Sequence, residues 1–476
     1  MSGVVRAEIG SFRYAAAGVD ALSGLAVDIS AGSLTGIVGA AGSGKSTLGA
    51  VLAGLLPRGS RGPAPGGGHD DDRLSGRLGL DGQQVVFDAD HAPRIDVAAW
   101  ARRVGMLPQD ARHYLSGVRA TVREELAFSL ENAGTPRSRM LAAVESVAGE
   151  LGIAHLLDAS PERLSGGQER LVAIAALAVA DPGAVVLDEP LAGLDADARA
   201  EVDGLISRLR ERGTAVVVMS HAFDELVTRA RTVHVLSGGR AAASGAPSEV
   251  RGAAEECGVL VGTGAPAPVP AGPAAGEALL EFERVRLRYP SAAAPAVDGL
   301  SLHADAGTCA ALLGPNGSGK TTVLKAAAGL LRPEGGRLRV EEPGLLLQNP
   351  ADQLFERTVE REVGFGLRGG RRNPAVAEVL GRLGLAGVAG THPYELPASQ
   401  RRLVALASVL VRRPRVLLLD EPTVALDAGG RRHLVDAIRY ALETGAAVLL
   451  STHDEPFAAA VAHRTTRLER AAPNGP

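Results

Sequence analysis

Two glycine-rich segments of the chain have the residue types and spacing that can wrap around phosphate groups. One runs from Gly39 to Ser46 (GAAGSGKS) and the other from Gly314 to Thr321 (GPNGSGKT), so both fit G-x-x-x-x-G-K-[ST]. Each follows a strand-like apolar run and precedes a helix-like run, which is the context that this pattern requires. Backbone N–H groups of such a loop, together with the positive end of the following helix, can bind phosphate oxygens. The sequence therefore predicts two sites for nucleotide phosphates.

Side chains inside these loops can bind the rest of a nucleotide–magnesium complex. Lys45 and Lys320 place a compact ammonium within reach of the β- and γ-phosphates. Ser46 and Thr321 place a hydroxyl that can ligate Mg²⁺. We expect the nucleotide to be held by these loop residues: Gly39, Gly42, Gly44, Lys45, Ser46, Thr47, Gly314, Gly317, Gly319, Lys320, Thr321 and Thr322.

Each half of the chain also contains an apolar run that ends in two acidic residues. The letters VVL precede Asp188 and Glu189, and LLL precede Asp420 and Glu421. An acidic pair at the end of a buried strand is costly unless a cation or substrate occupies it, which favours a site over a solvated turn. We expect Asp188 and Asp420 at the Mg²⁺ ion, directly or through water. Glu189 and Glu421 are expected to orient and polarise the attacking water.

Two histidines end another pair of strand-like runs. His221 follows VVVMS and His453 follows LLST. A lone histidine is more often structural, but the equivalent placement of these two favours a contact with the γ-phosphate. We therefore expect both histidines to take part in catalysis.

A short motif before a long apolar helix differs between the two halves. In the first half, Ser165, Gly166, Gly167 and Gln168 can form a helix N-terminus that donates to a phosphate with no side chain in the way. The second half has LPASQ at residues 396–400 instead of LSGGQ. There, Pro397 lacks both a hydroxyl and a backbone donor, and Ser399 is expected to place a side chain where the phosphate comes close.

The motifs recur in the same order, so the chain contains two copies of one domain. Lys45 and Lys320 lie 275 positions apart and Asp188 and Asp420 lie 232 apart, so the first copy is longer. Its extra residues, around 58–90, are rich in Gly, Pro and Asp and are read as a surface excursion. The expected boundaries are 1–250 for domain 1, 251–278 for a Pro/Ala/Gly-rich linker and 279–470 for domain 2.

Composition excludes several classes of protein. The chain has 476 residues, a net charge of −4 and only 3% aromatic residues, which disfavours a nucleic-acid-binding surface. Two cysteines cannot form a disulfide framework, and a reducing cytosol fits them. The longest apolar run, residues 171–180, is shorter than the ~18 residues that span a bilayer. We therefore expect a cytoplasmic protein with no membrane span of its own.

In both halves these motifs resemble the ATP-binding-cassette (ABC) ATPases, in family order and across nearly the whole chain. The resemblance implies an α/β fold of two tandem P-loop domains, each with a mostly parallel sheet core, an antiparallel β subdomain and a helical subdomain. ATP with Mg²⁺ is the implied cofactor. The resemblance also assigns Gln109 and Gln348 to the Q-loops near the metal, and Tyr14 and Tyr289 to stacking on adenine, with core packing as the alternative for the tyrosines.

A narrower resemblance concerns the segments QNPADQLF at 348–355 and TVEREVGF at 358–365. They look like the Q-loop region of energy-coupling-factor (ECF) importer ATPases, and 108–115 with 121–128 is a looser version. This implies two membrane partners, a coupling (T-type) subunit and a substrate-capture subunit, and a location on the inner face of the membrane. A sugar-type fused importer ATPase is one alternative. A translation factor or DNA-maintenance ATPase is another, although residues 252–282 contain no Lys or Arg.

The family pairs two such domains head to tail, so that each ATP lies between the phosphate loop of one domain and the signature motif of the other. On that arrangement the altered motif at 396–400 faces Lys45, Glu189 and His221, and the intact motif at 164–168 faces the second phosphate loop. Losing two charge-assisted hydrogen bonds would slow turnover about 10²–10⁴-fold. We therefore expect hydrolysis mainly at the site of Glu421 and His453.

Overall fold

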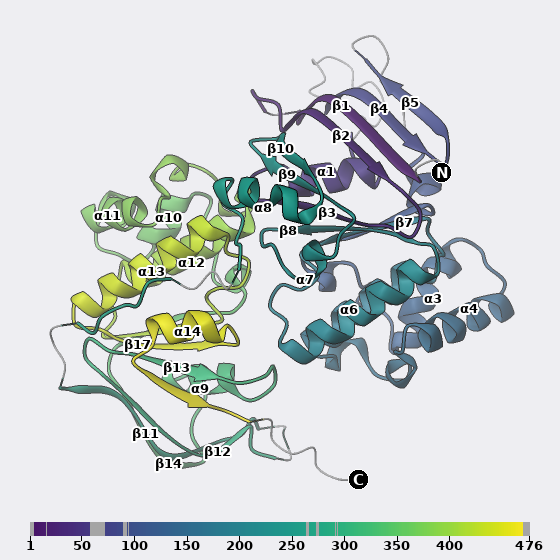
Figure 1. Cartoon of the computed structure of the whole chain (residues 1–476). Helices are drawn as coiled ribbons and strands as arrows, with labels where there is room; N and C mark the ends of the chain where they lie inside the picture. Colours follow the sequence, from purple (N-terminus) through teal and green to yellow (C-terminus); the bar gives the residue numbers. More distant parts are fainter. Residues whose placement is uncertain are drawn as a thin grey trace, which may run out of the picture. The chain divides into compact units, whose positions relative to one another are not determined.

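The computed structural model describes residues 4–15, 17–57, 72–88, 93, 95–262, 266–272, 276–290, 292 and 294–469. The chain divides into two compact units, Met1–Gly262 and Thr263–Pro476, here called unit 1 and unit 2 (Figure 1). Each unit has one antiparallel sheet, one mostly or wholly parallel sheet, and helices. The expected α/β fold of two tandem domains is therefore confirmed.

The antiparallel sheet of unit 1 has the strand order β2-β1-β4-β5. Side chains alternate between its faces, so Val5, Ala7 and Ile9 of β1 are buried while their neighbours are not. The strands are β1 (Val5–Arg13), β2 (Leu22–Ile29), β4 (Arg73–Leu80) and β5 (Gln83–Phe87).

The second sheet of unit 1 has the order β10-β9-β3-β8-β7-β6 and is parallel except for β10. Its central strands are apolar on both faces because helices cover one face and the antiparallel sheet with α1 covers the other. The strands are β3 (Leu34–Gly39), β6 (Val104–Leu107), β7 (Ala184–Asp188), β8 (Ala215–Ser220), β9 (Thr232–Ser237) and β10 (Arg240–Gly245).

The helices of unit 1 fall on both sides of this sheet. Residues of α3 to α8 share a core with one face, whereas α1 packs against the other. The helices are α1 (Lys45–Leu52), α2 (Val97–Ala101), α3 (Val122–Asn132), α4 (Arg137–Glu150), α5 (Gly166–Ala178), α6 (Ala196–Glu211), α7 (Glu225–Thr228) and α8 (Pro247–Glu256).

Unit 2 repeats this plan with fewer strands. Its antiparallel sheet has the order β12-β11-β14 and its parallel sheet the order β15-β16-β17-β13-β18. The strands are β11 (Ala278–Leu287), β12 (Val297–Asp305), β13 (Cys309–Leu313), β14 (Gly335–Val340), β15 (Pro343–Leu346), β16 (Val416–Asp420), β17 (Ala447–Thr452) and β18 (Arg464–Arg467). The helices, of which α10 and α11 lie side by side (Figure 1), are α9 (Lys320–Ala327), α10 (Val359–Gly364), α11 (Pro374–Arg382), α12 (Ala398–Leu410), α13 (Ala428–Glu443) and α14 (Glu455–Val461).

The extra residues of the first copy are not simply a surface excursion, so that prediction is wrong for the part that the structure describes. Strands β4 and β5 form an antiparallel pair, and Leu74, Leu78 and Phe87 are buried in the core of unit 1. The apolar residues alternate with polar ones, which is the period that places one face of a strand inward. Residues 58–71, 89–92 and 94 lie outside the described residues.

Both ends of the segment expected to be a linker (251–278) pack against a unit. Ala254 of α8 is buried in unit 1, and the Leu260 carbonyl accepts a hydrogen bond from the backbone N–H of Phe223. Val269 is buried in unit 2 and donates its N–H to Ala460. Residues 263–265 and 273–275 lie outside the described residues. The two units therefore extend into this range from both sides, with the division after Gly262.

Candidate nucleotide site

The two phosphate loops connect equivalent elements in the two units. Each runs from the end of a strand, β3 or β13, to the first residue of a helix, α1 or α9. The residues before these helices, Gly44 and Gly319, have φ of 99° and 95°. At Gly44 an added Cβ would also lie 2.9 Å from Leu22, so both conformation and space favour glycine.

Both loop lysines are buried and point back into their own loop. Lys45 Nζ donates to the carbonyls of Gly39 (2.7 Å) and Ala40 (3.0 Å). Lys320 Nζ makes the same bond to Gly314, at 2.7 Å, and lies 3.4 Å from Glu421 Oε1. The ammonium groups are thus enclosed in the loops where phosphate oxygens would replace carbonyl partners.

The hydroxyl and carboxylate expected at Mg²⁺ lie together in each unit. Ser46 Oγ donates to Asp188 Oδ2 at 2.8 Å, and Thr321 hydrogen-bonds Asp420. Burial, followed by the like charge of Glu189, raises the pKa of Asp188 to about 6. Burial likewise raises the pKa of Asp420. A divalent cation would offset the cost of these buried charges, and the oxygen donors are of the kind that Mg²⁺ prefers.

Each catalytic glutamate candidate is paired with the histidine that ends the neighbouring strand. His221 Nδ1 lies 2.6 Å from Glu189 Oε1, and His453 Nδ1 lies 2.9 Å from Glu421 Oε2. Burial opposes the ionised form of both glutamates, but the histidines and the loop lysines outweigh it, so the pKa of each glutamate lies below its usual range. Both carboxylates are therefore available as bases at neutral pH. Contact of the histidines with a γ-phosphate stays a prediction.

The backbone of these glutamates is strained. Glu189 has φ of 52° and Glu421 has φ of 45°, in the left-handed region that residues with a Cβ seldom adopt. Both are buried at the carboxyl end of a parallel strand, β7 or β16. Strained residues of this kind persist only where the surroundings fix them, and they cluster at functional sites.

An arginine that the sequence analysis missed holds each of these glutamates. Arg170 of α5 donates to the carbonyls of Glu189 (2.7 Å) and Gln109 (3.1 Å). Arg402 of α12 makes the equivalent pair of bonds in unit 2. The only signal in the sequence is that both arginines stand two residues after the last residue of LSGGQ or LPASQ.

One residue separates each Q-loop glutamine from the end of a strand: Gln109 from β6 and Gln348 from β15. Their backbone carbonyls accept hydrogen bonds from the arginines: Gln109 from Arg170 and Gln348 from Arg402. The expected role of their side-chain amides near the metal stays a prediction.

The two tyrosines expected at adenine are partly exposed, and the Tyr14 ring also contacts the ring of buried Phe12. Tyr14 is 39% and Tyr289 is 36% exposed. The hydroxyl oxygen of Tyr14 lies 2.9 Å from Thr47 Oγ1, and that of Tyr289 lies 3.4 Å from Thr322 Oγ1. Each tyrosine hydroxyl therefore lies beside the helix that follows the phosphate loop. Stacking of the rings on adenine stays a prediction.

The signature motif of unit 1 forms a capped helix N-terminus. Ser165 is the N-cap of α5 and accepts from Gln168 N at 3.3 Å, while Gln168 Oε1 accepts from Ser165 N at 3.0 Å. Ser165 and Gly166 are exposed and Gly167 is buried. The free N–H groups of this turn can bind an anion.

The altered motif of unit 2 begins a helix of the same length without a side-chain cap. Pro397 is the N-cap of α12 and supplies neither a hydroxyl nor an N–H. The expectation for Ser399 is wrong: its side chain is buried, and Oγ donates to Asp427 Oδ1 at 3.3 Å instead of facing a phosphate. Ser399 faces Gly430, and an added Cβ there would lie 2.6 Å from Ser399 Oγ.

Unit 1 has the reverse combination at these two places. Gly167 faces Ala198, and an added Cβ on Gly167 would lie 2.8 Å from the Ala198 Cβ. In each unit a glycine and a larger residue therefore share one space between two helices. The larger residue is on the second helix in unit 1 (Ala198 of α6) and on the first helix in unit 2 (Ser399 of α12). The loss of function expected at the altered motif thus rests on Pro397 alone.

In each phosphate loop one buried hydroxyl has no hydrogen-bond partner among the described residues. These are Ser43 Oγ and Ser318 Oγ, which the sequence analysis did not select. An unsatisfied buried donor is costly and is rare in folded proteins. A phosphate oxygen would satisfy it, so the residues present fit a nucleotide.

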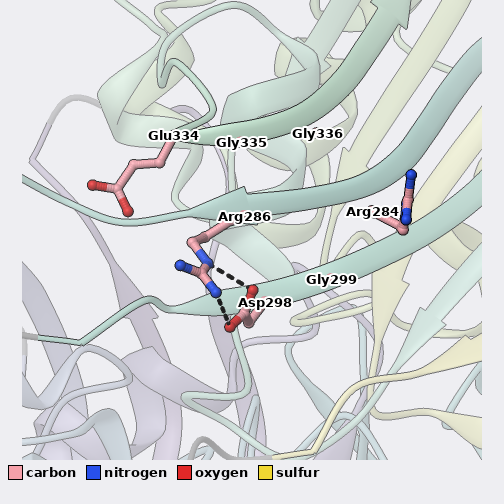
Figure 2. Close-up of a pocket in the computed structure, with 7 residues that line it drawn as sticks. All are labelled: Arg284, Arg286, Asp298, Gly299, Glu334, Gly335 and Gly336. Atoms are coloured by element: carbon pink, nitrogen blue, oxygen red, sulfur yellow. Dashed lines mark hydrogen bonds and ion pairs between the residues drawn. The ribbon is translucent and has the colours of Figure 1, made fainter.

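A hollow of about 560 Å³ on the antiparallel sheet of unit 2 involves none of the expected site residues. Figure 2 shows Arg286 of β11 bonded through two nitrogens to Asp298 of β12, at 2.7 and 2.8 Å. Arg284 lies in a bulge with φ of 46°. Because charges of both signs line this hollow, it offers no preference for phosphate.

Each unit has a phosphate loop, a hydroxyl–carboxylate pair and a glutamate–histidine pair, all at the carboxyl ends of parallel strands. This combination defines a P-loop nucleotide hydrolase. The family described as ABC transporter matches residues 22–192 and 297–424. The chain belongs to this family, whose members hydrolyse ATP. Among the described residues, none of the helices is long and apolar enough to cross a bilayer.

Relatives match over nearly the whole chain. A Bifidobacterium longum protein, named as an ABC transporter ATP-binding protein, is 32% identical over 95% of this chain, which spans 63% of that relative's length. A Bacillus subtilis protein named YkoD, an HMP/thiamine import ATP-binding protein, is 29% identical over 93% of this chain and 86% of its own. The solved structure of an RNase-L inhibitor has a TM-score of 0.61 at 23% identity, over 97% of this chain and 88% of its own, and shows the same fold.

Proposed function

We propose that this chain is the ATP-hydrolysing component of an ECF-type importer, docked on membrane partners at the inner face of the membrane. The observation that carries the proposal is an exposed apolar groove beside the Q-loop of unit 2. It has a volume of about 260 Å³ and is lined by Gly344, Leu345, Gln353, Phe355, Glu362, Phe365, Ser408, Val409 and Arg412.

Two phenylalanines give this groove its apolar character. Phe355 is 63% and Phe365 is 50% exposed, and their rings meet edge to face with centroids 4.7 Å apart. Large aromatic side chains are seldom left in solvent without a binding role. An apolar helix end of a membrane-embedded coupling subunit is the partner that suits such a surface.

Buried polar contacts keep the groove in shape. The carboxylate of Glu362 accepts the N–H groups of Phe355 (2.8 Å) and Glu356 (2.7 Å). Gln353 bonds the backbone on both sides of the Q-loop start, at Leu345 and Leu347. These residues belong to the two segments that resemble ECF ATPases, so the resemblance corresponds to a preorganised surface.

The equivalent surface of unit 1 is built differently. Its buried Glu125 accepts from the N–H and the hydroxyl of Ser116, so a serine stands where unit 2 exposes Phe355. The two units therefore present unequal surfaces. We propose that a coupling subunit contacts them in unequal ways, as the fusion of two different domains permits.

We further propose that the two units pair head to tail around ATP, and that hydrolysis occurs mainly at the site of Lys320, Glu421 and His453. Support comes from the N-cap positions: Ser165 of α5 has a hydroxyl, whereas Pro397 of α12 has neither a hydroxyl nor a backbone N–H. Each lost charge-assisted bond costs about 1.5–3 kcal/mol if it forms only in the transition state. The other site then binds ATP and holds the units closed.

The name of the Bacillus subtilis relative supports a small vitamin-like cargo, captured by a separate subunit. A sugar-type fused importer is the alternative within transport, and the segment at 348–355 argues against it. A ribosome- or DNA-bound ATPase is the alternative outside transport. A nucleic-acid-binding ATPase needs basic residues to contact phosphates, but residues 252–282 contain no basic residue.

Co-purification tests the proposal. The full chain, expressed in its own host and extracted in mild detergent, should retain apolar membrane proteins and neither ribosomes nor DNA. Phe355→Asp with Phe365→Asp should abolish that retention while ATP hydrolysis by the isolated chain persists. Leu330→Asp changes an exposed apolar residue outside the groove and should retain the partners. The proposal would be refuted if the chain retained ribosomes or DNA, or if the double variant still retained the membrane proteins.

A further inference from the structure

Each unit has an arginine whose guanidinium joins two loops of the nucleotide site. Arg402 is 5% exposed. Its Nη1 donates to the Glu421 carbonyl at 3.1 Å and its Nη2 to the Gln348 carbonyl at 2.7 Å. In unit 1, Arg170 makes the same two contacts, at 2.7 Å to Glu189 and 3.1 Å to Gln109, with a third at 3.3 Å to Ala192.

The carbonyl that Arg402 holds belongs to the strained residue of the site. Glu421 donates its N–H to the Ser451 carbonyl, and its own carbonyl also accepts from Val424 N. Its carboxylate is held by His453 and lies near Lys320. A residue with φ of 45° keeps that conformation only if its peptide groups are fixed on both sides. Arg402 supplies the fixing bond from α12, the helix of the altered signature motif.

Stability alone does not account for this arginine. Burial lowers its pKa to about 10, so it stays charged at neutral pH in a place that opposes the charge. Its Nε has no hydrogen-bond partner among the described residues. Buried charges of this kind add little net stability, and an apolar residue of similar volume would often serve better. The two carbonyls that it binds both belong to loops of the site.

We infer that Arg402 is a positioning residue for ATP hydrolysis: by holding the Glu421 and Gln348 carbonyls together, it fixes the Glu421 carboxylate and links it to the Q-loop. Arg170 has the same place at Glu189. The inference rests on the proposed function, in which the Glu421 site hydrolyses ATP. The planar guanidinium of an arginine can donate to two carbonyls at once in a fixed geometry, whereas the ammonium of a lysine is a compact point charge.

Steady-state ATPase kinetics of the full chain test this inference. Arg402→Met should lower kcat about 10- to 100-fold with KM for ATP within about threefold, because misplacing a catalytic group by 1 Å has an effect of that size. Arg402→Lys keeps the charge but should remain at least about fivefold below the unaltered chain. Arg401→Met removes the neighbouring charge, whose guanidinium bonds Tyr394 and Leu396 instead, and should leave kcat within about twofold.

The outcomes separate cleanly. Unchanged kcat in Arg402→Met, full recovery in Arg402→Lys, or a raised KM at constant kcat would overturn the inference. If Arg402→Met does not fold, Arg402→Lys decides alone, since it retains charge and volume. Glu421→Gln is the reference for the proposed function. Loss of activity in Glu421→Gln with normal Arg402 variants refutes only the inference, whereas normal activity in Glu421→Gln refutes the proposed function itself.

Discussion

His453 Nδ1 lies 2.9 Å from Glu421 Oε2, a carboxylate oxygen of a residue that is only 3% exposed. Burial alone would raise the pKa of Glu421, but the hydrogen bond and charge of His453, with Lys320, bring it below its usual range. The histidine therefore favours the ionised form of Glu421, the proposed general base, before any nucleotide contact is considered.

Replacing this histidine should change the pH dependence of hydrolysis as well as its rate. In His453→Ala the burial of Glu421 is opposed by less charge, so the pKa of Glu421 rises. As the pH is lowered, activity should then begin to fall at a higher pH than in the unaltered chain, and kcat at alkaline pH should fall about 10²-fold or more. A pH–rate profile checks this. The same profile shape in both proteins would contradict the assigned pairing.

Asp188 should destabilise the metal-free protein at neutral pH. Its pKa of about 6 lies above the value near 4 of an unfolded chain, so the cost is absent below about pH 4 and complete above about pH 6. Asp188→Asn should therefore raise the free energy of unfolding by up to about 3 kcal/mol at pH 7.5, and by much less at pH 4.5. Urea titrations without Mg²⁺ at the two pH values measure the difference. Asp158→Asn, an exposed aspartate, should show no comparable gain.

The exchanged pair Ser399 and Gly430 should behave as one packing unit. Gly430→Ala alone places a Cβ 2.6 Å from Ser399 Oγ and should cost about 1–3 kcal/mol of stability through overpacking. Combining it with Ser399→Gly reproduces the Gly167–Ala198 arrangement and should recover most of that loss. Urea denaturation of both single variants and the double variant gives the coupling energy. Additive effects would show that the two side chains do not share one space.

Tyr289 should contribute stacking energy to ATP binding and little to folding. Tyr289→Ala should weaken ATP binding by about 5- to 100-fold, the range of base–aromatic stacking, whereas Tyr289→Phe keeps the ring and should stay within about threefold. Calorimetric titration of the Glu421→Gln background avoids turnover during the measurement. Equal loss in both variants would assign the effect to the hydroxyl contact with Thr322 instead of the ring.

The sequence was sufficient for features whose physics is local. Each phosphate loop needs glycine with a positive φ, at Gly42 and Gly44 or at Gly317 and Gly319, and a following helix. Both features can be recognised from consecutive residues. Likewise, the acids at the ends of β7 and β16 could be placed because a short apolar run ends directly before them.

Features that depend on segments distant in the chain could not be placed from sequence. Arg402 binds carbonyls 54 and 19 positions away, so nothing beside it indicates its role. The direction of the Ser399 side chain follows from the glycine that faces it on α13. Strands β4 and β5 were missed because the Gly- and Pro-rich residues before them dominate the local composition.

The most direct test of the account compares two isosteric changes in the full chain. Glu421→Gln and Glu189→Gln leave the loops and their lysines in place and remove only the base of one site or the other. We predict that Glu421→Gln lowers the ATPase rate by about 100-fold or more, while Glu189→Gln lowers it by less than about threefold. Equal losses from the two changes would contradict the claim that the chain hydrolyses ATP at one of two unequal sites.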